Sequence, residues 1–360
     1  MPLEKVLVTG GAGFIGTRLV TRLCQEGIEV VVADVLHPQV HSGGRPDALP
    51  EAATLFPLDV VHGPTWDALF RLFQPDTVVH LAAETGTGQS LLEASRHGMV
   101  NVVGTTQLLD AMARSESIPA HLVLSSSRAV YGEGEWEADG ERFYPAPRTH
   151  AELEAAAWDP RSPSGKPAKA LASVAGATRT EPINVYGATK LAQEHMLKAW
   201  GAALGSAVSI LRFQNVYGVG QSLTNPYTGV LSLFAQMALR GETLPVYEDG
   251  VIIRDFVYVD DIVDALWATL LRPPATGRLL NVGSGASTTI FDAASALAAR
   301  AGAPDPVITG AFRDGDVRAA SCDIAATRAE LGYEPRWNIA DGLDALLDWV
   351  DRELNEQEAS

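Results

Sequence analysis

Five short runs of apolar, largely β-branched residues within the first 127 positions constrain the fold most strongly. They predict strands at residues 5–9, 29–34, 54–59, 77–83 and 120–127, with helical patterns between them. Unbroken apolar strands joined by helices are typical of a parallel sheet that is covered on both faces. Right-handed crossovers then give a doubly wound α/β sheet of the Rossmann type.

Regular patterning stops after residue 132 and resumes near residue 183. The segment 133–182 is rich in Pro, Gly, Ala and charged residues without a clear period, apart from a helical stretch around 151–157. We interpret it as a long excursion beside the site rather than as a linker between domains. A helix at 186–203 and a strand at 207–213 follow.

The order of these patterns predicts two domains of unequal size. We expect a dinucleotide-binding domain over residues 1–213, which includes the excursion and to which the chain returns near 256–285. We expect a smaller, discontinuous C-terminal substrate-binding domain over residues 214–255 and 286–352.

The chain is acidic, with a formal net charge of -17 and a pI of about 4.8. Nucleic-acid binding requires the opposite sign, so we expect no DNA or RNA partner. No apolar stretch approaches the roughly 18 residues of a membrane span, and no secretory signal precedes the first strand. Two distant cysteines, Cys24 and Cys322, predict neither a disulfide framework nor a metal site, so the expected location is a reducing cytoplasm.

The segment VTGGAGFIG (8–16) places three glycines between the first strand and the first helix. Gly10 permits a tight turn, Gly13 lets the backbone approach a pyrophosphate at the helix N-terminus, and Gly16 allows close packing of the helix. Asp34 ends the second strand, where a carboxylate binds the adenosine ribose hydroxyls and repels a 2′-phosphate. The pattern predicts a site for NAD rather than NADP. The alternative is a glycine turn with a structural role alone.

Tyr186 and Lys190 lie four residues apart in a helical pattern, so their side chains share one face of the helix. A cation about 4 Å from a phenol favours the phenolate by ~4 kcal/mol at an effective dielectric near 20. That is about three pKa units before desolvation is counted, and Lys190, helped by oxidised nicotinamide, is expected to supply the charge that makes Tyr186 a general base for a sugar hydroxyl. The alternative is a solvated Tyr–Lys pair on the helix surface.

Three serines, Ser125–Ser127, end the fifth predicted strand, where ligands bind in doubly wound sheets. A hydroxyl at this place can pass a proton between a substrate and Tyr186. Serines at strand ends also bond their own backbone often, which is the alternative.

The chain resembles the extended short-chain dehydrogenases, and among them the nucleotide-sugar epimerase/dehydratase family, over residues 6–349. The likeness depends on five motifs in the right order: TGGAGFIG, SSSRAVYG, YGATK, RFQNVYG and RDFVYVDDI. It implies a Rossmann fold, bound NAD and a nucleotide-diphosphate sugar as substrate. It also implies a homodimer, formed through the segments 91–114 and 186–203.

The resemblance assigns roles to single residues of this chain. It implies that Ser127, Tyr186 and Lys190 are catalytic and that no metal takes part. Besides Tyr186 and Lys190, it implies cofactor contacts at Gly10, Gly13, Phe14, Ile15, Gly16, Asp34, Asp59, Val60, Leu81, Ala82, Ala83 and Asn101. It implies substrate contacts at Thr85, Ser127, Arg128, Asn215, Val246, Tyr247, Arg254 and Arg313. Loops 84–90 and 222–230 are expected to line the sugar pocket. For Arg254 and Arg313 the alternative is salt bridging between the domains.

Two residues depart from the pattern of the family. Gln214 stands where an aromatic residue is usual, and Arg128 where small residues are common. Arg128 and Ala129 occupy the places of the acidic pair of resembling dehydratases, which disfavours dehydration. The expected activity is 4-epimerisation of a dTDP-rhamnose, UDP-glucuronate or UDP-glucose type of substrate through a transient 4-keto sugar. The alternatives are a UDP-uronate decarboxylase or a 4,6-dehydratase, and more distantly a non-catalytic NAD-sensing protein.

Overall fold

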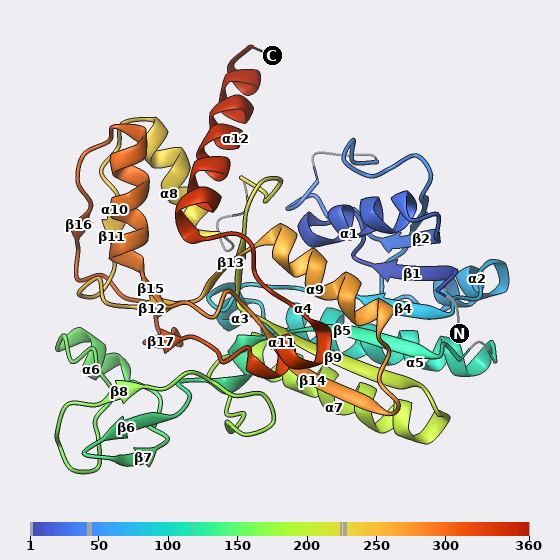
Figure 1. Cartoon of the computed structure of the whole chain (residues 1–360), viewed down its shortest axis with the longest axis horizontal. Helices are drawn as coiled ribbons and strands as arrows, with labels where there is room; N and C mark the ends of the chain where they lie inside the picture. The colour runs from blue at the N-terminus through green and yellow to red at the C-terminus, as the bar shows by residue number, and fades with distance from the viewer. Residues whose placement is uncertain (1–2, 42–44, 117, 224, 226–228, 360) are drawn as a thin grey trace.

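The computed structural model describes residues 3–41, 45–116, 118–223, 225 and 229–359. Its centre is a seven-stranded sheet in the order β14-β9-β5-β4-β1-β2-β3, in which all neighbours are parallel (Figure 1). The strands are β1 (Lys5–Thr9), β2 (Glu29–Asp34), β3 (Thr54–Pro57), β4 (Thr77–His80), β5 (His121–Ser127), β9 (Ala207–Phe213) and β14 (Gly277–Val282). This order confirms the doubly wound Rossmann sheet predicted from the sequence.

Helices cover both faces of the sheet. α1 (Phe14–Gln25) and α9 (Val259–Leu271) bury apolar stripes against one face, and α2 (Gly63–Leu72), α5 (Gly104–Arg114) and α7 (Val185–Leu204) against the other. In α1, Leu19, Val20 and Leu23 are fully buried at the spacing of one helix face. The shorter segments are α3 (Gln89–Leu92), α4 (Ala94–His97), the π-helix η1 (Gly98–Val103), the 3-10 turn η2 (Arg128–Tyr131) and α11 (Ala325–Leu331).

A second apolar core lies among α8 (Val230–Leu239), α10 (Ile290–Ala301) and α12 (Ile339–Ala359), at one end of the molecule (Figure 1). Leu231, Phe234, Leu297 and Leu346 are among its buried side chains. Short strands connect this core to the sheet: β10 (Asn215–Tyr217) with β13 (Phe256–Tyr258), β11 (Pro245–Val246) with β16 (Val307–Ile308), and β12 (Ile253–Arg254) between β15 (Thr288–Thr289) and β17 (Ala319–Ala320).

The excursion forms a small unit of its own. Its strands β6 (Trp136–Ala138), β7 (Glu141–Phe143) and β8 (Lys169–Ala170) make an antiparallel sheet in the order β7-β6-β8. The helix α6 (His150–Glu154) lies between β7 and β8 along the chain. Strands of two or three residues are too short for a sequence period, so patterning did not predict them. The helix begins at a capping box of Thr149 and Glu152, one residue earlier than expected.

Buried arginines join the excursion to the C-terminal part of the chain. Arg148 donates from Nη1 to both carboxylate oxygens of Glu248 at 2.9 Å and from Nη2 to the Asp316 carbonyl at 2.9 Å. Its Nε donates to Glu133 at 3.3 Å. Arg318 bridges Glu248 at 3.0 Å and Asp159 of the excursion at 2.8 Å. Because the side chains of Arg148, Arg318 and Glu248 are buried, each needs its partners to offset desolvation.

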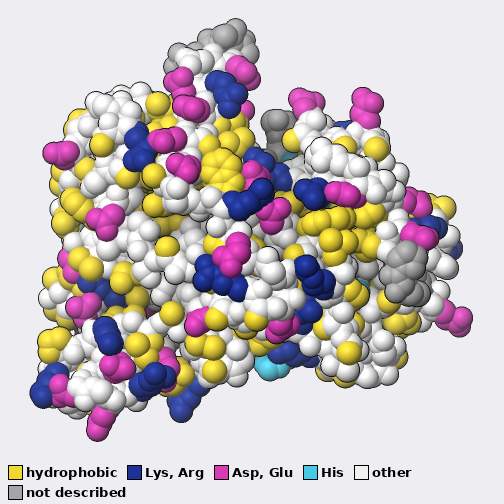
Figure 2. Space-filling model, viewed as in Figure 1, with side chains coloured by type: hydrophobic (Ala, Val, Ile, Leu, Met, Phe, Trp, Pro, Cys, Tyr) yellow, Lys and Arg dark blue, Asp and Glu magenta, His cyan; other side chains and the backbone are white. Residues whose placement is uncertain are grey.

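Charged side chains of both signs are interspersed over the face shown in Figure 2, without a continuous basic patch. No helix within the described ranges is both long and apolar enough to cross a bilayer.

Candidate active site

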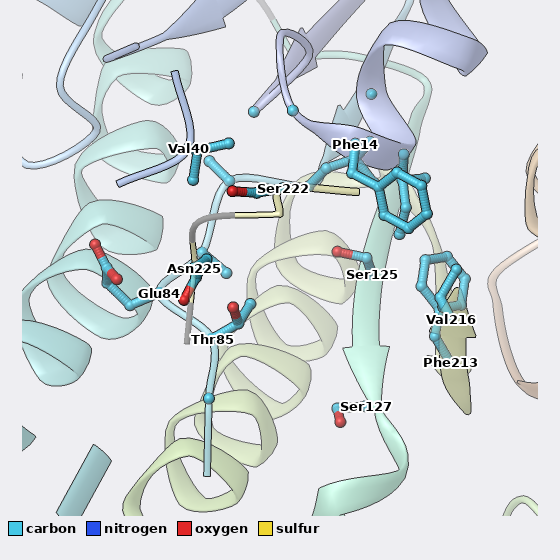
Figure 3. Close-up of a pocket in the computed structure, with 18 of the residues that line it drawn as sticks. Phe14, Val40, Glu84, Thr85, Ser125, Ser127, Phe213, Val216, Ser222 and Asn225 are labelled. Carbon is cyan, nitrogen blue, oxygen red and sulfur yellow. The ribbon is translucent and has the colours of Figure 1, made fainter. Parts of the chain in front are cut away.

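A cavity of about 620 Å³ opens at the carboxyl ends of β1, β4 and β5, where the strand order reverses. It brings together seventeen of the residues expected from the sequence: Gly10, Gly13, Phe14, Ile15, Gly16, Asp34, Asp59, Val60, Leu81, Ala82, Ala83, Thr85, Ser127, Arg128, Tyr186, Lys190 and Asn215. Figure 3 shows Phe14, Phe213 and Val216 on one side of the cavity, Glu84 and Thr85 on the other, and Ser125 and Ser127 on β5 between them.

The glycine turn admits no side chain at its two ends. Gly10 has φ +65°, and a Cβ there would lie 2.7 Å from the backbone nitrogen of Ala82. A Cβ on Gly16 would lie 2.4 Å from the Gly10 carbonyl oxygen. The turn therefore keeps α1 close to β1, with the helix N-terminus facing the cavity.

Replacing Gly16 with alanine is expected to lower NAD affinity about tenfold, because a backbone shift of 1–3 kcal/mol is needed to relieve the clash with the turn. The measurement is the NAD released from purified protein on denaturation, together with a binding titration. Gly88→Ala is the matched control, since a Cβ at Gly88 meets nothing within 4 Å. Equal NAD content in the two variants would contradict the role of the turn.

Asp34 at the end of β2 is suited to a ribose. Its Oδ2 accepts a hydrogen bond from the Ala12 N–H at 3.0 Å and its Oδ1 from the Leu36 N–H at 2.9 Å. These bonds fix the carboxylate on the cavity wall beside Asp59 and Val60.

Among the described residues, the loop after Asp34 contributes no arginine to the cavity lining. Arg96 of α4 reaches Gln39 of that loop, but it is paired with Glu84 and Glu93, both at 2.9 Å. The residues present thus fit NAD.

The candidate catalytic hydroxyls lie on β5 and α7. Ser127 ends β5, and its Oγ accepts a hydrogen bond from the Ala129 N–H at 3.1 Å, so it also caps η2. Tyr186 lies in the first turn of α7, whose N-terminus is capped by the Asn184 side chain. Both side chains line the cavity, and hydrogen bonding to Ser127 acts to lower the pKa of Tyr186.

Lys190 is buried on α7 beside the end of β5. Its Nζ donates to the Ser125 carbonyl at 2.9 Å, and burial lowers its pKa to about 7. Burial also raises the pKa of Tyr186, with Ser127 and the charge of Arg128 acting in the opposite direction. The ionisation of Tyr186 is expected from Lys190 combined with bound oxidised nicotinamide, so for that state it stays a prediction. Sequence spacing gives proximity but not the desolvation that both groups undergo.

Arg128 lies between the catalytic hydroxyls and Asn215. Its Nε donates to the Asn215 Oδ1 at 3.1 Å. Burial, and then repulsion from Arg254, lower the pKa of Arg128 to about 10, so it stays charged at neutral pH.

Five expected residues lie outside the cavity lining. Arg254 pairs with Asp316 at 2.7 Å, Arg313 stacks over the Tyr247 ring at 5.2 Å, and Val246 is fully buried. Asn101 faces inward from the π-helix, where its amide bonds the Glu84 backbone and the Thr189 hydroxyl. It thus holds the loop that carries Thr85 rather than facing the cavity itself.

Sequence reasoning missed several polar residues of the lining, which include His37, Gln39, Arg96 and Gln221. Gln39 donates to the Asn225 Oδ1 at 3.0 Å and so joins two distant loops. Loop residues of this kind have no period or spacing by which to find them. Of the predicted pocket loop 222–230, Ser222, Asn225, Gly229 and Val230 line the cavity; residues 224 and 226–228 lie outside the described residues.

The sequence of the chain was compared with protein families and with known proteins. The model of the NAD dependent epimerase/dehydratase family matches residues 6–283. The chain is 52% identical to a dTDP-L-rhamnose 4-epimerase of Burkholderia thailandensis, over 98% of this chain and 96% of that protein.

Solved structures of epimerases superpose on nearly the whole of this chain. The UDP-glucose 4-epimerase of Thermotoga maritima, crystallised with UDP-glucose, superposes with a TM-score of 0.79 at 28% identity, covering 98% of this chain and 100% of that one. The UDP-glucose 4-epimerase of Thermus thermophilus in complex with NAD gives a TM-score of 0.76 at 28% identity, covering 97% and 99%.

Proposed function

This chain belongs to the NAD dependent epimerase/dehydratase family, and from that membership we propose that it inverts C4 of a nucleotide-activated hexose, with dTDP-L-rhamnose as the favoured substrate. The observation that carries the proposal is the cavity in which Ser127, Tyr186 and Lys190 meet the glycine turn. The full-length likeness to a dTDP-L-rhamnose 4-epimerase supports the choice of sugar.

In the proposed reaction, Tyr186 removes the proton of the 4-hydroxyl, and Ser127 shares that proton through its hydrogen bond to the phenol. The glycine turn and Asp34 would hold NAD, which would supply the oxidation of C4 to a ketone and its reduction from the other face of the sugar. Tyr186 then gives the proton back to O4. The diphosphate is held at Asn215, while the sugar stays free enough to turn over.

Arg254 and Arg313 are the remaining proposed contacts of the diphosphate. To reach it they would have to leave Asp316 and the Tyr247 ring, their partners in this structure. Dehydration is disfavoured, because Arg128 and Ala129 supply neither of the two acids that elimination uses in resembling dehydratases.

The direct test incubates the purified protein, loaded with NAD, with dTDP-L-rhamnose, UDP-glucose and UDP-glucuronate in turn. NMR of the products is expected to show the C4 diastereomer, formed fastest from dTDP-L-rhamnose. Release of carbon dioxide from the uronate would instead assign a decarboxylase, and loss of water a dehydratase. If no sugar is converted, the proposal fails.

We also propose the domain division at residues 1–213 with 256–285, and 214–255 with 286–352, and a homodimer through segments 91–114 and 186–203. The exposed Leu91, Leu92 and Met99 support the dimer, since they place apolar side chains together on the first segment. Light scattering at several concentrations is expected to give twice the chain mass.

A further inference from the structure

The cavity wall offers few cations to the anionic part of a substrate. Among the described residues that line it, the lysine and arginine side chains are Arg96, Arg128 and Lys190. Arg96 is paired with Glu84 and Glu93, both at 2.9 Å. Lys190 donates to a backbone carbonyl of β5 and is a proposed contact of the cofactor. Arg128 is therefore the cation of the wall that remains for a substrate.

The guanidinium of Arg128 is only partly used by the protein. Its Nε donates to the Asn215 Oδ1 at 3.1 Å. Within the described ranges, its two terminal amino groups have no hydrogen-bond acceptor and form no ion pair. Free donors on a planar, charged group match two oxygens of a phosphate. A bound anion would also offset the repulsion that Arg128 undergoes from Arg254.

The hydrogen bond to Arg128 also orients the Asn215 amide. The Asn215 backbone is fixed by β10, where its N–H donates to the Asp255 carbonyl at 3.0 Å. Because Oδ1 accepts from Arg128, the amino group is the end of the amide that remains for another partner. That amino group has no acceptor among the described residues. Arg128 and Asn215 thus place unused donors side by side on the cavity wall.

The two arginines expected at the diphosphate are engaged elsewhere. Arg254 donates to Asp316 at 2.7 Å, and Arg313 lies over the Tyr247 ring at 5.2 Å. Neither belongs to the lining of the cavity as the described residues form it. A diphosphate that enters the cavity would therefore reach Arg128 without displacing a protein partner of its terminal amino groups.

We propose that Arg128 and Asn215 together bind the phosphate next to the sugar, with Arg128 supplying the charge and Asn215 a second donor. The inference rests on the proposed function and deepens it, because it identifies the residues that recognise the diphosphate of that substrate. Ser127 directly precedes Arg128 in the chain. A phosphate held in this way keeps the attached sugar next to the proposed catalytic hydroxyl.

The test measures the affinity of the NAD-loaded protein for dTDP, dTMP and thymidine by titration calorimetry. Arg128→Met is expected to weaken dTDP binding about tenfold or more, the usual loss of a hydrogen bond to a charged group. Binding of thymidine and dTMP, which lack the second phosphate, is expected to stay within about threefold of the wild type. Arg128→Lys keeps the charge without the planar fork, and its affinity for dTDP should lie between those of the wild type and Arg128→Met.

A double-mutant cycle tests whether the two residues act as a pair. Asn215→Ala is expected to weaken dTDP binding as well. The double variant, Arg128→Met with Asn215→Ala, should lose less than the product of the two single losses, since either change breaks the same pair. Losses that multiply fully would overturn the joint role.

Arg278→Met is the matched control. Arg278 lies at the amino end of β14, where its side chain is 9% exposed and pairs with Glu330 at 2.8 Å, outside the cavity lining. Its loss removes the same charge and should leave dTDP binding unchanged. Equal NAD content and equal circular dichroism are the check that each variant is folded.

Unchanged dTDP binding in Arg128→Met overturns the inference. A rise in KM for dTDP-L-rhamnose without a loss of dTDP affinity also overturns it, since Arg128 would then contact the sugar. If the wild-type protein binds dTDP but converts no nucleotide sugar, the proposed function fails, while the affinities still decide the role of Arg128.

Discussion

Replacing Tyr186 with phenylalanine is expected to lower kcat by about 10²- to 10⁴-fold, the usual contribution of a general base. The phenol lines the cavity and can take a proton from the substrate, whereas phenylalanine keeps the ring and its packing against His97. KM and NAD content are expected to change little, because the hydroxyl is not part of the glycine turn. Turnover is measured by the conversion of dTDP-L-rhamnose followed by NMR.

Tyr144→Phe is the control for this prediction. Tyr144 lies in the excursion, where its hydroxyl accepts a hydrogen bond from the Arg179 N–H at 3.3 Å, outside the cavity. The same chemical change there should leave kcat at the wild-type level. Wild-type turnover in Tyr186→Phe would remove the tyrosine from the mechanism.

Replacing Arg148 with methionine is expected to lower the free energy of unfolding by about 3–5 kcal/mol, the cost of breaking a buried ion pair from one side. The side chains of Arg148, Glu133 and Glu248 are 3%, 2% and 1% exposed, so the two carboxylates would remain buried without this partner. Arg318 still reaches Glu248, which limits the loss there. Denaturant unfolding, followed by circular dichroism, measures the change.

Arg161→Met serves as the control within the same segment. Its side chain is 80% exposed and lies 3.5 Å from Glu152, so the substitution should change stability by no more than about 0.5 kcal/mol. If both variants unfold at the same denaturant concentration, the arginine network does not anchor the excursion.

The parts of the fold that follow a strong local pattern could be predicted from the sequence. β1, β2 and β9 have the expected bounds, because short runs that are largely apolar lie between turn residues and define each strand on both sides. β4 ends at His80 rather than Ala83, because Leu81–Ala83 leave the ladder and line the cavity. The strands of the excursion are held by cross-strand pairing and buried charge, neither of which leaves a period in the sequence.

The site likewise contains residues that the sequence predicts and features that it does not. Residues tied to a motif at the end of a strand, such as Gly10, Asp34 and Ser127, reach the cavity because the sheet order places those ends together. Arg254 also belongs to a motif, but its side chain points to Asp316, with which it forms a hydrogen bond. Asp316 is distant in sequence, so the motif does not predict this orientation. The pKa of Lys190 depends on burial, which only the folded structure supplies.

The excursion begins a few residues after Ser127 and ends a few residues before Tyr186. Its two ends are in contact, since a Cβ on Gly132 would lie 2.1 Å from the Glu181 carbonyl oxygen. Its far side is fastened through Arg148 to Glu248, in the other half of the molecule. A hinge motion that separated the excursion from the segment around Glu248 would have to break these buried ion pairs. The cost of separating them ties the position of the excursion to that of Glu248.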